Sequence, residues 1–465
     1  MSALPVSGTS MNATQRLGRF VARSATENLS PKVAEKAAIV MLDSLGLAVA
    51  SRNERTAAAM RAATTPVPGA VPNTARIWAD GQRVALSEAV AANALAVHAH
   101  FQDDTDHNSW SHPGSLIAPI AVCIGESTGA SITEVLRSIV AGYTTMEWLG
   151  ADEIVSLALI RRGIRTSPTL GTIGAAAAAS VAFNLDESKA THAVAMAAGI
   201  TGANLEPVRS GSDEWRLHNA HASRGGLTAA QLAAQGVQGA PDALEGAKGF
   251  LRSLAGLTET PAKWRGDPNP QIMLQIMAKP FATLGDNMSA VVAARLLHQD
   301  GVALDRVKRI TVRIWRPYTE YPGTSFKGPF ERPVQTQAST AFATSAMLVH
   351  GELGYDIGVE GRNDPRILKL VALTTVEPED KTALDAEVVV ELDDGKVLRR
   401  TAQESPRTLI FQDRARATQV LEQRLARGGS RPGTGKALSD CVFTALDRGS
   451  KLDIRAVLDS FQPAR

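Results

Sequence analysis

Cysteine is scarce in this chain, and its charges nearly cancel. Only Cys123 and Cys441 occur among 465 residues, which excludes a disulfide framework and a cluster held by three thiolates. Lysine and arginine number 49 against 47 for aspartate and glutamate, a formal net charge of +2. This balance gives no electrostatic basis for binding nucleic acid or an anionic membrane, so neither partner is expected.

Long apolar runs are also missing. No stretch reaches the roughly 20 uninterrupted apolar residues that a membrane-spanning helix needs. Residues 1–12 are polar and lack the basic-then-apolar layout of a secretory signal. We therefore expect a cytoplasmic protein without disulfide bonds.

Aromatic residues make up only 5% of the chain, whereas alanine and glycine are abundant. Small side chains let helices approach closely, which favours a helix-rich fold. The length exceeds what one compact core holds, so we expect two or three domains. Hydrophobic periodicity predicts a run of helices through the first 265 residues. They are expected at 13–50, 87–100, 114–126, 132–149, 172–183, 186–199 and 222–236, with Pro31 and Ser131 at helix starts.

The pattern changes near residue 266. Residues 308–315 alternate polar and apolar side chains, as a half-buried strand does. Two more strands are expected on either side of a hairpin turn, Asp393-Asp394-Gly395. The further elements are strands at 386–392 and 396–401 and helices at 286–298, 339–350 and 364–371. Residues 266–402 are therefore predicted to form an α+β domain.

The last part of the chain returns to a helical pattern over 408–462, with a loop at 428–435. That loop contains Gly433-Thr434-Gly435-Lys436-Ala437, which resembles a fragment of a phosphate-binding loop. The first glycine is missing at the required spacing, and Ala437 stands where a hydroxyl would meet magnesium, so we reject this interpretation. No GxSxG elbow or GxGxxG after a strand supports a hydrolase or a dinucleotide-binding protein. Periodicity leaves open whether 403–465 joins the first domain.

The densest polar cluster lies between residues 98 and 115. It holds four histidines and three aspartates: His98, His100, His107, His112, Asp103, Asp104 and Asp106. An acid–base site is the favoured interpretation, because imidazole moves protons near neutral pH. A metal site is a second interpretation, but the spacing matches no HExxH-like pattern. A polar loop between helices, with Asp103 and Asp104 as caps, is a third.

A second polar cluster runs from Glu214 to His221, just before the helix predicted at 222. Arg216 is suited to hold a carboxylate by bidentate pairing. The alternative is a structural salt bridge at Arg216, with His218 as a satisfied buried histidine. Lys279 lies at the predicted domain junction, where ligand clefts often form.

Together these segments resemble the MmgE/PrpD family over essentially the whole chain. The resemblance rests on Met41-Leu42-Asp43-Ser44-Leu45-Gly46, Asp103-Asp104-Thr105, His112-Pro113-Gly114-Ser115, Ser167-Pro168-Thr169, Gly171-Thr172-Ile173-Gly174, Arg216-Leu217-His218, Gly225-Gly226-Leu227 and Lys279-Pro280-Phe281. It implies a mainly α fold: a large all-helical domain built from both chain ends, 1–265 and 403–465, and a smaller α+β lid domain, 266–402. It also implies a homodimer that uses no metal and no organic cofactor.

Known activities of the family are 2-methylcitrate dehydratase, cis-aconitate decarboxylase and iminodisuccinate epimerase, all on small di- or tricarboxylates. The resemblance therefore implies proton transfer next to a carboxylate. The dehydratase and decarboxylase pattern has aspartate, histidine, lysine and tyrosine where this chain has Phe101, Ser167, Trp215 and Phe342. Elimination and decarboxylation need a proton donor, whereas epimerisation only removes and returns one proton.

We therefore predict an epimerase of iminodisuccinate type. A 2-methylcitrate-dehydratase-like hydro-lyase, or a decarboxylase acting on a tricarboxylate, is the first alternative. The second is a scaffold of this family that lost its chemistry and serves in binding or assembly. The retained His112 and Lys279 argue against the scaffold.

The resemblance also assigns roles to individual residues. His112 and Lys279 are predicted to transfer protons, with Tyr143 as the second acid or base if Lys279 binds a carboxylate instead. The predicted substrate-binding residues are Arg216 and Arg165 as carboxylate clamps, Thr105 and His107 as orienting groups or supports of His112, His218, and Asp104, which would fix a neighbouring imidazole.

Overall fold

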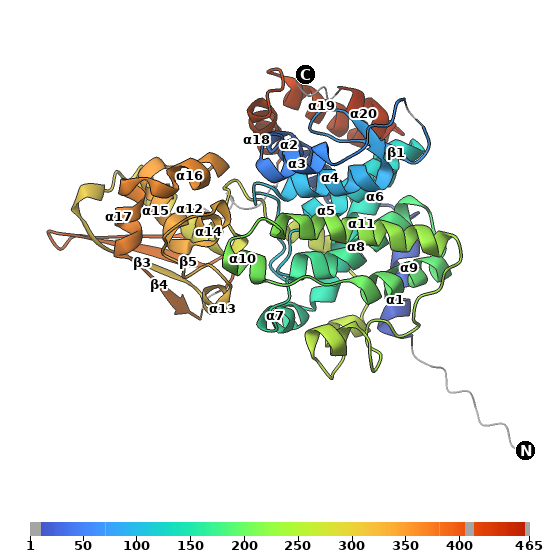
Figure 1. The fold of residues 1–465 in the computed structure, drawn as a ribbon, viewed down its shortest axis with the longest axis horizontal. Helices are drawn as coiled ribbons and strands as arrows, with labels where there is room; N and C mark the ends of the chain where they lie inside the picture. The colour runs from blue at the N-terminus through green and yellow to red at the C-terminus, as the bar shows by residue number, and fades with distance from the viewer. Residues whose placement is uncertain (1–10, 70, 381, 405–412, 461–465) are drawn as a thin grey trace, which may run out of the picture.

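Both ends of the chain contribute helices to the larger part of the molecule, which we call the helical body (Figure 1). In this computed structural model the described residues are 11–69, 71–380, 382–404 and 413–460. The body contains α1 (Ala13–Ser24), α2 (Pro31–Ala50), α3 (Arg55–Ala62), α4 (Leu86–His98), α5 (Pro113–Thr128), α6 (Ile132–Gly150), α7 (Ile154–Arg161), α8 (Thr166–Ala182), α9 (Glu187–Ile200), α10 (Glu206–Ser210) and α11 (Trp215–Ala234).

Three helices from the end of the chain complete this body. They are α18 (Arg414–Arg427), α19 (Thr434–Asp447) and α20 (Ile454–Ser460). α18 and α19 pack against α2, and α20 packs against α5. A Cβ on Gly46 of α2 would lie 2.9 Å from the Leu421 side chain, so α2 and α18 are in close contact. The question that periodicity left open is thereby answered for the described part of the tail.

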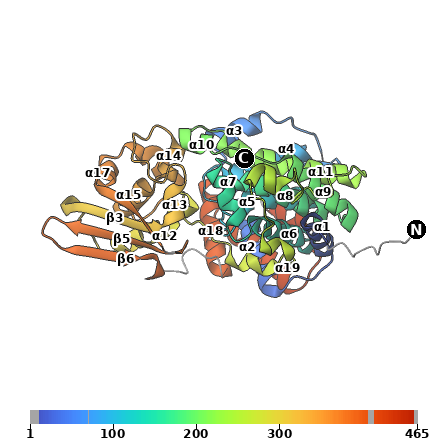
Figure 2. The same cartoon turned by 90° about the horizontal axis from the view of Figure 1, so that it is seen from below.

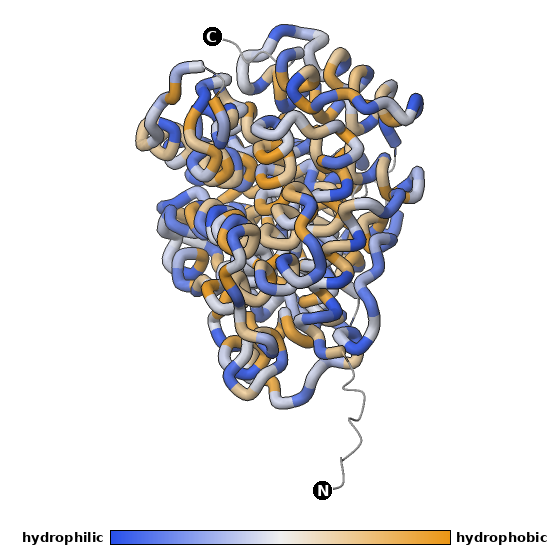
Figure 3. Tube along the Cα trace, turned by 90° about the vertical axis from the view of Figure 1, so that its right-hand side faces the viewer, coloured by the Kyte–Doolittle hydropathy of each residue, from blue (hydrophilic) through white to orange (hydrophobic). Residues whose placement is uncertain are grey.

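α8 runs through the middle of the helical body. All but its last residue is buried, because α5, α6 and α11 pack around it. Glycine makes these contacts possible: a Cβ on Gly174 would lie 2.6 Å from Cγ of Met146, and one on Gly226 would lie 2.5 Å from Cβ of Ala175. Hydrophobic stretches of the trace gather toward the interior (Figure 3). The close crossing is confirmed, although α8 begins before Thr172, where periodicity placed its start.

The two predicted helix starts are confirmed. Pro31 is the first residue of α2, where its fixed φ suits the helix and its missing N–H costs nothing. Ser131 caps α6: its Oγ accepts from the N–H of Glu134 at 3.4 Å, and the Glu134 carboxylate accepts from the Ser131 N–H at 2.7 Å. This reciprocal pair satisfies two backbone donors that the helix itself leaves unpaired.

A four-stranded sheet with helices packed on it forms the smaller part, which we call the lid (residues 288–404; Figure 2). Its strands are β3 (Val307–Trp315), β4 (Thr374–Glu379), β5 (Ala386–Leu392) and β6 (Val397–Thr401). Its helices are α12 (Met288–Gln299), α13 (Arg316–Glu320), α14 (Pro333–Ala338), α15 (Thr340–His350), α16 (Tyr355–Glu360) and α17 (Pro365–Leu373). The strand order is β4-β3-β5-β6, with β4 parallel to β3 and the other pairs antiparallel.

The lid has a hydrophobic core of its own, separate from that of the helical body. Val312 of β3 pairs with Val388 of β5 inside it. The turn between β5 and β6 has φ +85° at Gly395, a conformation that glycine adopts without strain, so the predicted hairpin is confirmed. The expected fold class, mainly α with a smaller α+β part, is confirmed as well.

Some elements differ from the sequence expectations. The second polar cluster lies on α11 rather than before it, because α11 begins at Trp215 and packs its large first side chains into the interior. β4 was not predicted: it lies at the sheet edge, carries Pro378 and pairs with a strand distant in sequence. The short strands β1 (Thr74–Arg76) and β2 (Arg83–Ala85) were also missed.

The domain boundaries at 265/266 and 402/403 stay a prediction. Parts of the expected tail helix, 408–412 and 461–462, lie outside the described residues. Residues 1–10, most of the polar N-terminal segment that lacks the layout of a secretory signal, lie outside them as well. None of the described helices is both long enough and apolar enough to span a lipid bilayer.

Candidate active site

The histidine and aspartate cluster forms a buried loop between α4 and α5. His98 ends α4, and His112 is the residue that precedes α5. Midway along the loop, Thr105 and Met277 exchange two backbone hydrogen bonds of 3.0 and 2.8 Å. Although the two segments are distant in sequence, this bridge places the chain that leads to Lys279 alongside the loop.

Asp104 joins this loop to the start of α5 and to the middle of α6. Its Oδ1 accepts a hydrogen bond from the N–H of Gly114 at 2.7 Å, and its Oδ2 accepts one from the Tyr143 hydroxyl at 2.6 Å. A Cβ on Gly114 would lie 2.8 Å from Oδ1, so glycine leaves room for the contact. Burial raises the pKa of Asp104 to about 7, and burial together with the Asp104 charge raises the pKa of Tyr143 well above its ordinary value. Tyr143 therefore keeps its proton and holds Asp104 next to the first turn of α5.

His112 is buried with one ring nitrogen already engaged. Nδ1 lies 3.0 Å from the carbonyl oxygen of Asp104 and 3.0 Å from Oγ1 of Thr105. Because a carbonyl oxygen only accepts, Nδ1 carries the proton and Nε2 keeps its lone pair. Burial, and then the charge of Lys279, lower the pKa of His112 well below its ordinary value. His112 is thus a neutral imidazole suited to accept a proton at Nε2.

Lys279 is fully buried where the helical body meets the lid. Its Nζ donates to the carbonyl oxygen of Thr283 at 3.0 Å and lies 4.5 Å from the centre of the Phe101 ring. Burial lowers the pKa of Lys279 to about 8, with Asp103 as the main group opposing the shift. A lysine with this pKa holds or releases its proton close to neutral pH.

A second chain of buried polar groups leads to Arg165. Nδ1 of His98 lies 2.8 Å from a carboxylate oxygen of Asp103, and Nε2 lies 2.6 Å from Nη2 of Arg165. A carboxylate accepts and a guanidinium donates, so His98 is neutral with its proton on Nδ1. Burial lowers the pKa of His98 to about 4, in agreement with this tautomer.

His98 and Asp103 were not among the predicted site residues, although both stood in the cluster. The signal that could have found them is their separation of five residues across a helix end, which brings the two side chains together. Their pairing sets the orientation of the predicted clamp Arg165, which also donates to the carbonyl oxygen of Trp215.

Arg216 is buried and engaged by protein groups. Its Nε donates to the carbonyl oxygen of Ala99 at 3.0 Å, and its guanidinium lies 3.5 Å from the Asp213 carboxylate and 3.9 Å from that of Glu54. The guanidinium also lies 4.2 Å from the centre of the Trp215 ring. These contacts agree with the structural salt bridge, the alternative weighed against a carboxylate clamp.

The two other histidines predicted at the site, His107 and His218, lie on the loop and on α11. Nδ1 of His107 is hydrogen-bonded to the hydroxyl of Tyr318 in the lid, and its Nε2 lies 3.3 Å from the sulfur of Met277. His218 is half-buried on α11, where burial lowers its pKa to about 4. Their predicted roles in substrate binding stay predictions.

Aromatic rings fill the space between the polar groups. The ring centre of Phe101 lies 4.8 Å from that of Trp215 and 5.2 Å from that of His112, and Trp215 lies 4.9 Å from His98. Both aromatic side chains are buried. His112 and Lys279 therefore contact the same ring, that of Phe101.

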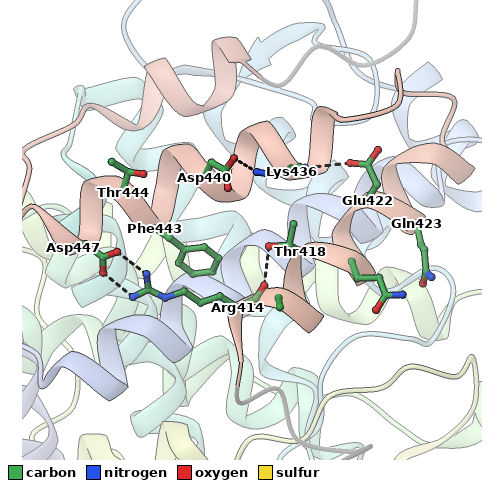
Figure 4. Close-up of a pocket in the computed structure, with 11 residues that line it drawn as sticks. Arg414, Thr418, Glu422, Gln423, Lys436, Asp440, Phe443, Thr444 and Asp447 are labelled. Atoms are coloured by element: carbon green, nitrogen blue, oxygen red, sulfur yellow. Dashed lines mark hydrogen bonds and ion pairs between the residues drawn. The ribbon is translucent and has the colours of Figure 1, made fainter.

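A separate hollow lies between α18 and α19 (Figure 4). Its charged side chains pair with one another, as Lys436 does with Asp440 at 2.5 Å. The backbone N–H groups of Gly433, Gly435 and Lys436 all donate to the Glu422 carboxylate. This carboxylate occupies the position that an anion would take at the start of α19, which agrees with the rejection of a phosphate-binding loop.

Metal binding was the second interpretation of the histidine cluster. Within the part of the chain that the structure describes, no group of three or more histidine, cysteine, aspartate or glutamate side chains is placed to hold a metal ion. Cys123 and Cys441 are both free thiols.

Comparison with known proteins assigns the chain to a family. The MmgE/PrpD N-terminal domain matches residues 15–262, more than half of the chain. The chain belongs to the MmgE/PrpD family. Human cis-aconitate decarboxylase is 26% identical over 339 residues, which are 67% of this chain and 67% of the human protein. The mouse cis-aconitate decarboxylase is 28% identical over 173 residues, 36% of this chain and 34% of the mouse protein.

Of the four departures from the family pattern that the resemblance gave, two lie in the middle of the site, one contacts His112 and one lies in the lid. Phe101 and Trp215, at positions where that pattern has an aspartate and a lysine, form the aromatic centre. Ser167, at the position of a histidine, accepts the backbone N–H of His112 at its Oγ, 3.1 Å away. Phe342, at the position of a tyrosine, packs inside the lid core. The predicted family is confirmed, whereas neither relative supports the iminodisuccinate specificity.

Proposed function

We propose that this member of the MmgE/PrpD family is a lyase that removes carbon dioxide or water from a small polycarboxylate, without a cofactor, as the family resemblance implies. The observation that supports it best is the pairing of His112, a neutral imidazole, with Lys279, an amine of pKa about 8, on one aromatic ring. Two relatives are named cis-aconitate decarboxylases, which favours a lyase over the epimerase predicted from the sequence.

The two residues have complementary parts in such a reaction. In a dehydration, Nε2 of His112 accepts the proton from the carbon next to the carboxylate, and Lys279 donates a proton to the departing hydroxyl. In a decarboxylation, the electron pair of the broken carbon–carbon bond stays on the substrate, and Lys279 protonates that carbon. In both cases the buried charge of Arg165 binds a substrate carboxylate.

Asp104, Thr105 and Tyr143 position the imidazole in this proposal. Thr105 and the Asp104 carbonyl hold Nδ1 of His112, and Tyr143 fixes the Asp104 carboxylate. Because Nδ1 is held by these contacts, the fold sets the direction of Nε2 before the substrate binds. These three residues act on the reaction through His112.

Epimerisation is the second candidate, and one observation favours it. Phe101 and Trp215 contribute no ionisable group to the centre, so the site holds fewer proton donors than the family pattern. Removal of a proton by His112 and its return by Lys279 on the opposite side of the same carbon would invert that carbon.

Proton NMR in deuterium oxide separates these candidates. The panel is cis-aconitate, citrate, 2-methylcitrate and the iminodisuccinate stereoisomers, each with the purified protein. The lyase predicts loss of carbon dioxide from cis-aconitate or loss of water from a citrate. Deuterium at the α-carbon of iminodisuccinate, with interconversion of stereoisomers, would instead establish the epimerase, and no reaction across the panel would contradict both. Light scattering on the same sample tests the predicted homodimer.

A further inference from the structure

A pocket of about 400 Å³ lies between α18 and the lid, outside the proposed active site. Four arginines line it: Arg295 of α12, and Arg416, Arg424 and Arg427 of α18. Among the described residues of its lining, the one carboxylate belongs to Glu352. Arginine side chains therefore outnumber carboxylates in this lining.

The arginines come from two different parts of the molecule. Arg424 pairs with Asp43 of α2, and Arg427 pairs with Asp356 of the lid helix α16. Across the pocket, Arg295 lies 5.9 Å from the ring of Phe281 and forms no ion pair with any described carboxylate. Arginines from the lid and from the body thus line the same space, and on the lid side an anion would supply the counter-charge that no described carboxylate gives to Arg295.

A buried histidine, His100, lies close enough to these arginines for their charges to lower its pKa. Burial lowers the pKa of His100 to about 3, and the next contributors to the shift are the charges of Arg427, Arg216 and Arg424. The ring of His100 stacks on that of Tyr355 in α16, with ring centres 4.1 Å apart. The field of the arginines therefore reaches the contact between the body and the lid.

One wall of the pocket is the back of the proposed active site. Gln102 and Pro280 line it, and they are next in sequence to Phe101 and Lys279. Nη2 of Arg424 lies 3.3 Å from the carbonyl oxygen of Lys279. The contacts that fix Arg424 therefore also fix the backbone that carries Lys279.

We propose that this arginine pocket binds a small multivalent oxyanion, which holds the lid against α18. Phosphate and carboxylate groups share the required chemistry, because guanidinium groups bind both through paired N–H donors. The volume suits a compact ligand such as pyrophosphate or a tricarboxylate. The inference does not depend on the reaction proposed above, because Arg295 and Arg427 have no part in it.

Ligand binding to the whole protein tests the proposal. Calorimetric titrations with inorganic phosphate, pyrophosphate and citrate are made at constant ionic strength, with chloride as the compensating salt. We expect saturable binding, which Arg295→Gln weakens at least tenfold and Arg295→Lys weakens less. Arg306→Gln, on an exposed arginine paired with Asp393, is the matched control and should bind like the wild type.

The source of the anion follows from the titrations. Binding of phosphate or pyrophosphate supports a phosphate ligand, and binding of citrate alone supports a polycarboxylate. Because citrate is also a candidate for the active site, its titration is repeated in Lys279→Met, where binding to the arginine pocket should persist. Loss of all citrate binding in that variant, equal binding by Arg295→Gln, or an effect that chloride reproduces would each overturn the proposal.

Hydrogen exchange tests the second half of the proposal, the contact between lid and body. Bound pyrophosphate, or citrate if it is the ligand, should slow exchange in residues 352–354 and in α18 of the wild type. The same anion should leave these segments unchanged in Arg295→Gln. Unchanged exchange in the wild type at a saturating concentration would show that the anion does not hold the lid.

Discussion

The hydroxyl of Tyr143 donates a 2.6 Å hydrogen bond to the carboxylate of Asp104, deep between α6 and the loop that carries His112. With the N–H of Gly114 as a second donor, this one carboxylate joins two helices and the loop. It is also fully buried and has a pKa of about 7. Both the placement of His112 and the response of the fold to pH therefore depend on it.

The stability of the protein should fall with rising pH because of Asp104. Its pKa is about 7 in the fold and about 3.9 in an unfolded chain, so the fold binds this proton more tightly. The resulting stabilisation is fully present below about pH 3.9 and is lost as the pH rises through 7. In urea unfolding between pH 4 and 7, we expect the wild type to lose stability relative to Asp104→Asn, with a slope approaching about 1.4 kcal/mol per pH unit.

The exposed carboxylate of Asp440 provides the control for this measurement. Asp440→Asn should follow the wild-type curve throughout the pH range. If the curves of Asp104→Asn and the wild type run parallel, Asp104 does not take up a proton in the fold.

His112→Ala and Lys279→Ala should each reduce turnover at least about 100-fold, since each removes a proton-transfer group. The far-UV circular dichroism should be unchanged, because neither side chain caps a helix through its own atoms. Turnover is measured on the substrate that the NMR panel identifies. Lys436→Ala, at a lysine on the surface of α19, should keep full activity, and near-full activity in both site variants would remove these residues from the mechanism.

The pH dependence of kcat/KM should report Lys279. If Lys279 donates a proton, activity requires its protonated form and should fall about tenfold per pH unit above pH 8. His112 is already neutral at pH 7 and should add no limb between pH 7 and 8. In Lys279→Arg the alkaline limb should disappear along with most of the activity, and a wild-type profile that stays flat to pH 10 would contradict the assignment.

Two adjacent glycines of α11 should respond in opposite ways to alanine. A Cβ on Gly226 would lie 2.6 Å from the backbone nitrogen of Ala176, so Gly226→Ala should destabilise the protein by about 1–3 kcal/mol through overpacking. A Cβ on Gly225 would lie 3.4 Å from Thr172, an ordinary contact. Gly225→Ala should therefore be neutral or stabilising by up to about 1 kcal/mol, because alanine favours a helix. Chemical unfolding measures both, and equal effects would show that α8 and α11 are not packed this closely.

Much of the fold could be predicted because local signals agree with the final packing. The start of α2 at Pro31, the capping of α6 by Ser131 and the hairpin at Gly395 all arise from neighbouring residues. The start of α11 at Trp215 and the strand β4 depend instead on what packs or pairs with them from elsewhere in the chain. The hydrophobic periodicity of the sequence does not show these long-range contacts.

The site divides in the same way. The family resemblance pointed to His112 and Lys279, and the bridge between Thr105 and Met277 explains how they come together. The spacing of His98 and Asp103 could have shown their pairing, whereas the contact with Arg165 could not be predicted, because Arg165 is distant in sequence and meets them only in the folded interior.

The ion pair between Arg424 and Asp43 joins residues 381 positions apart, and Arg424 also reaches the carbonyl oxygen of Lys279. During translation, α2 is synthesised long before α18, so Asp43 has no Arg424 to pair with until α18 follows. The segment that carries Lys279 gains its contact with Arg424 only after α18 has been synthesised. A nascent chain that stops before α18 would contain nearly every residue of the site but would lack the contact between Arg424 and the backbone of Lys279.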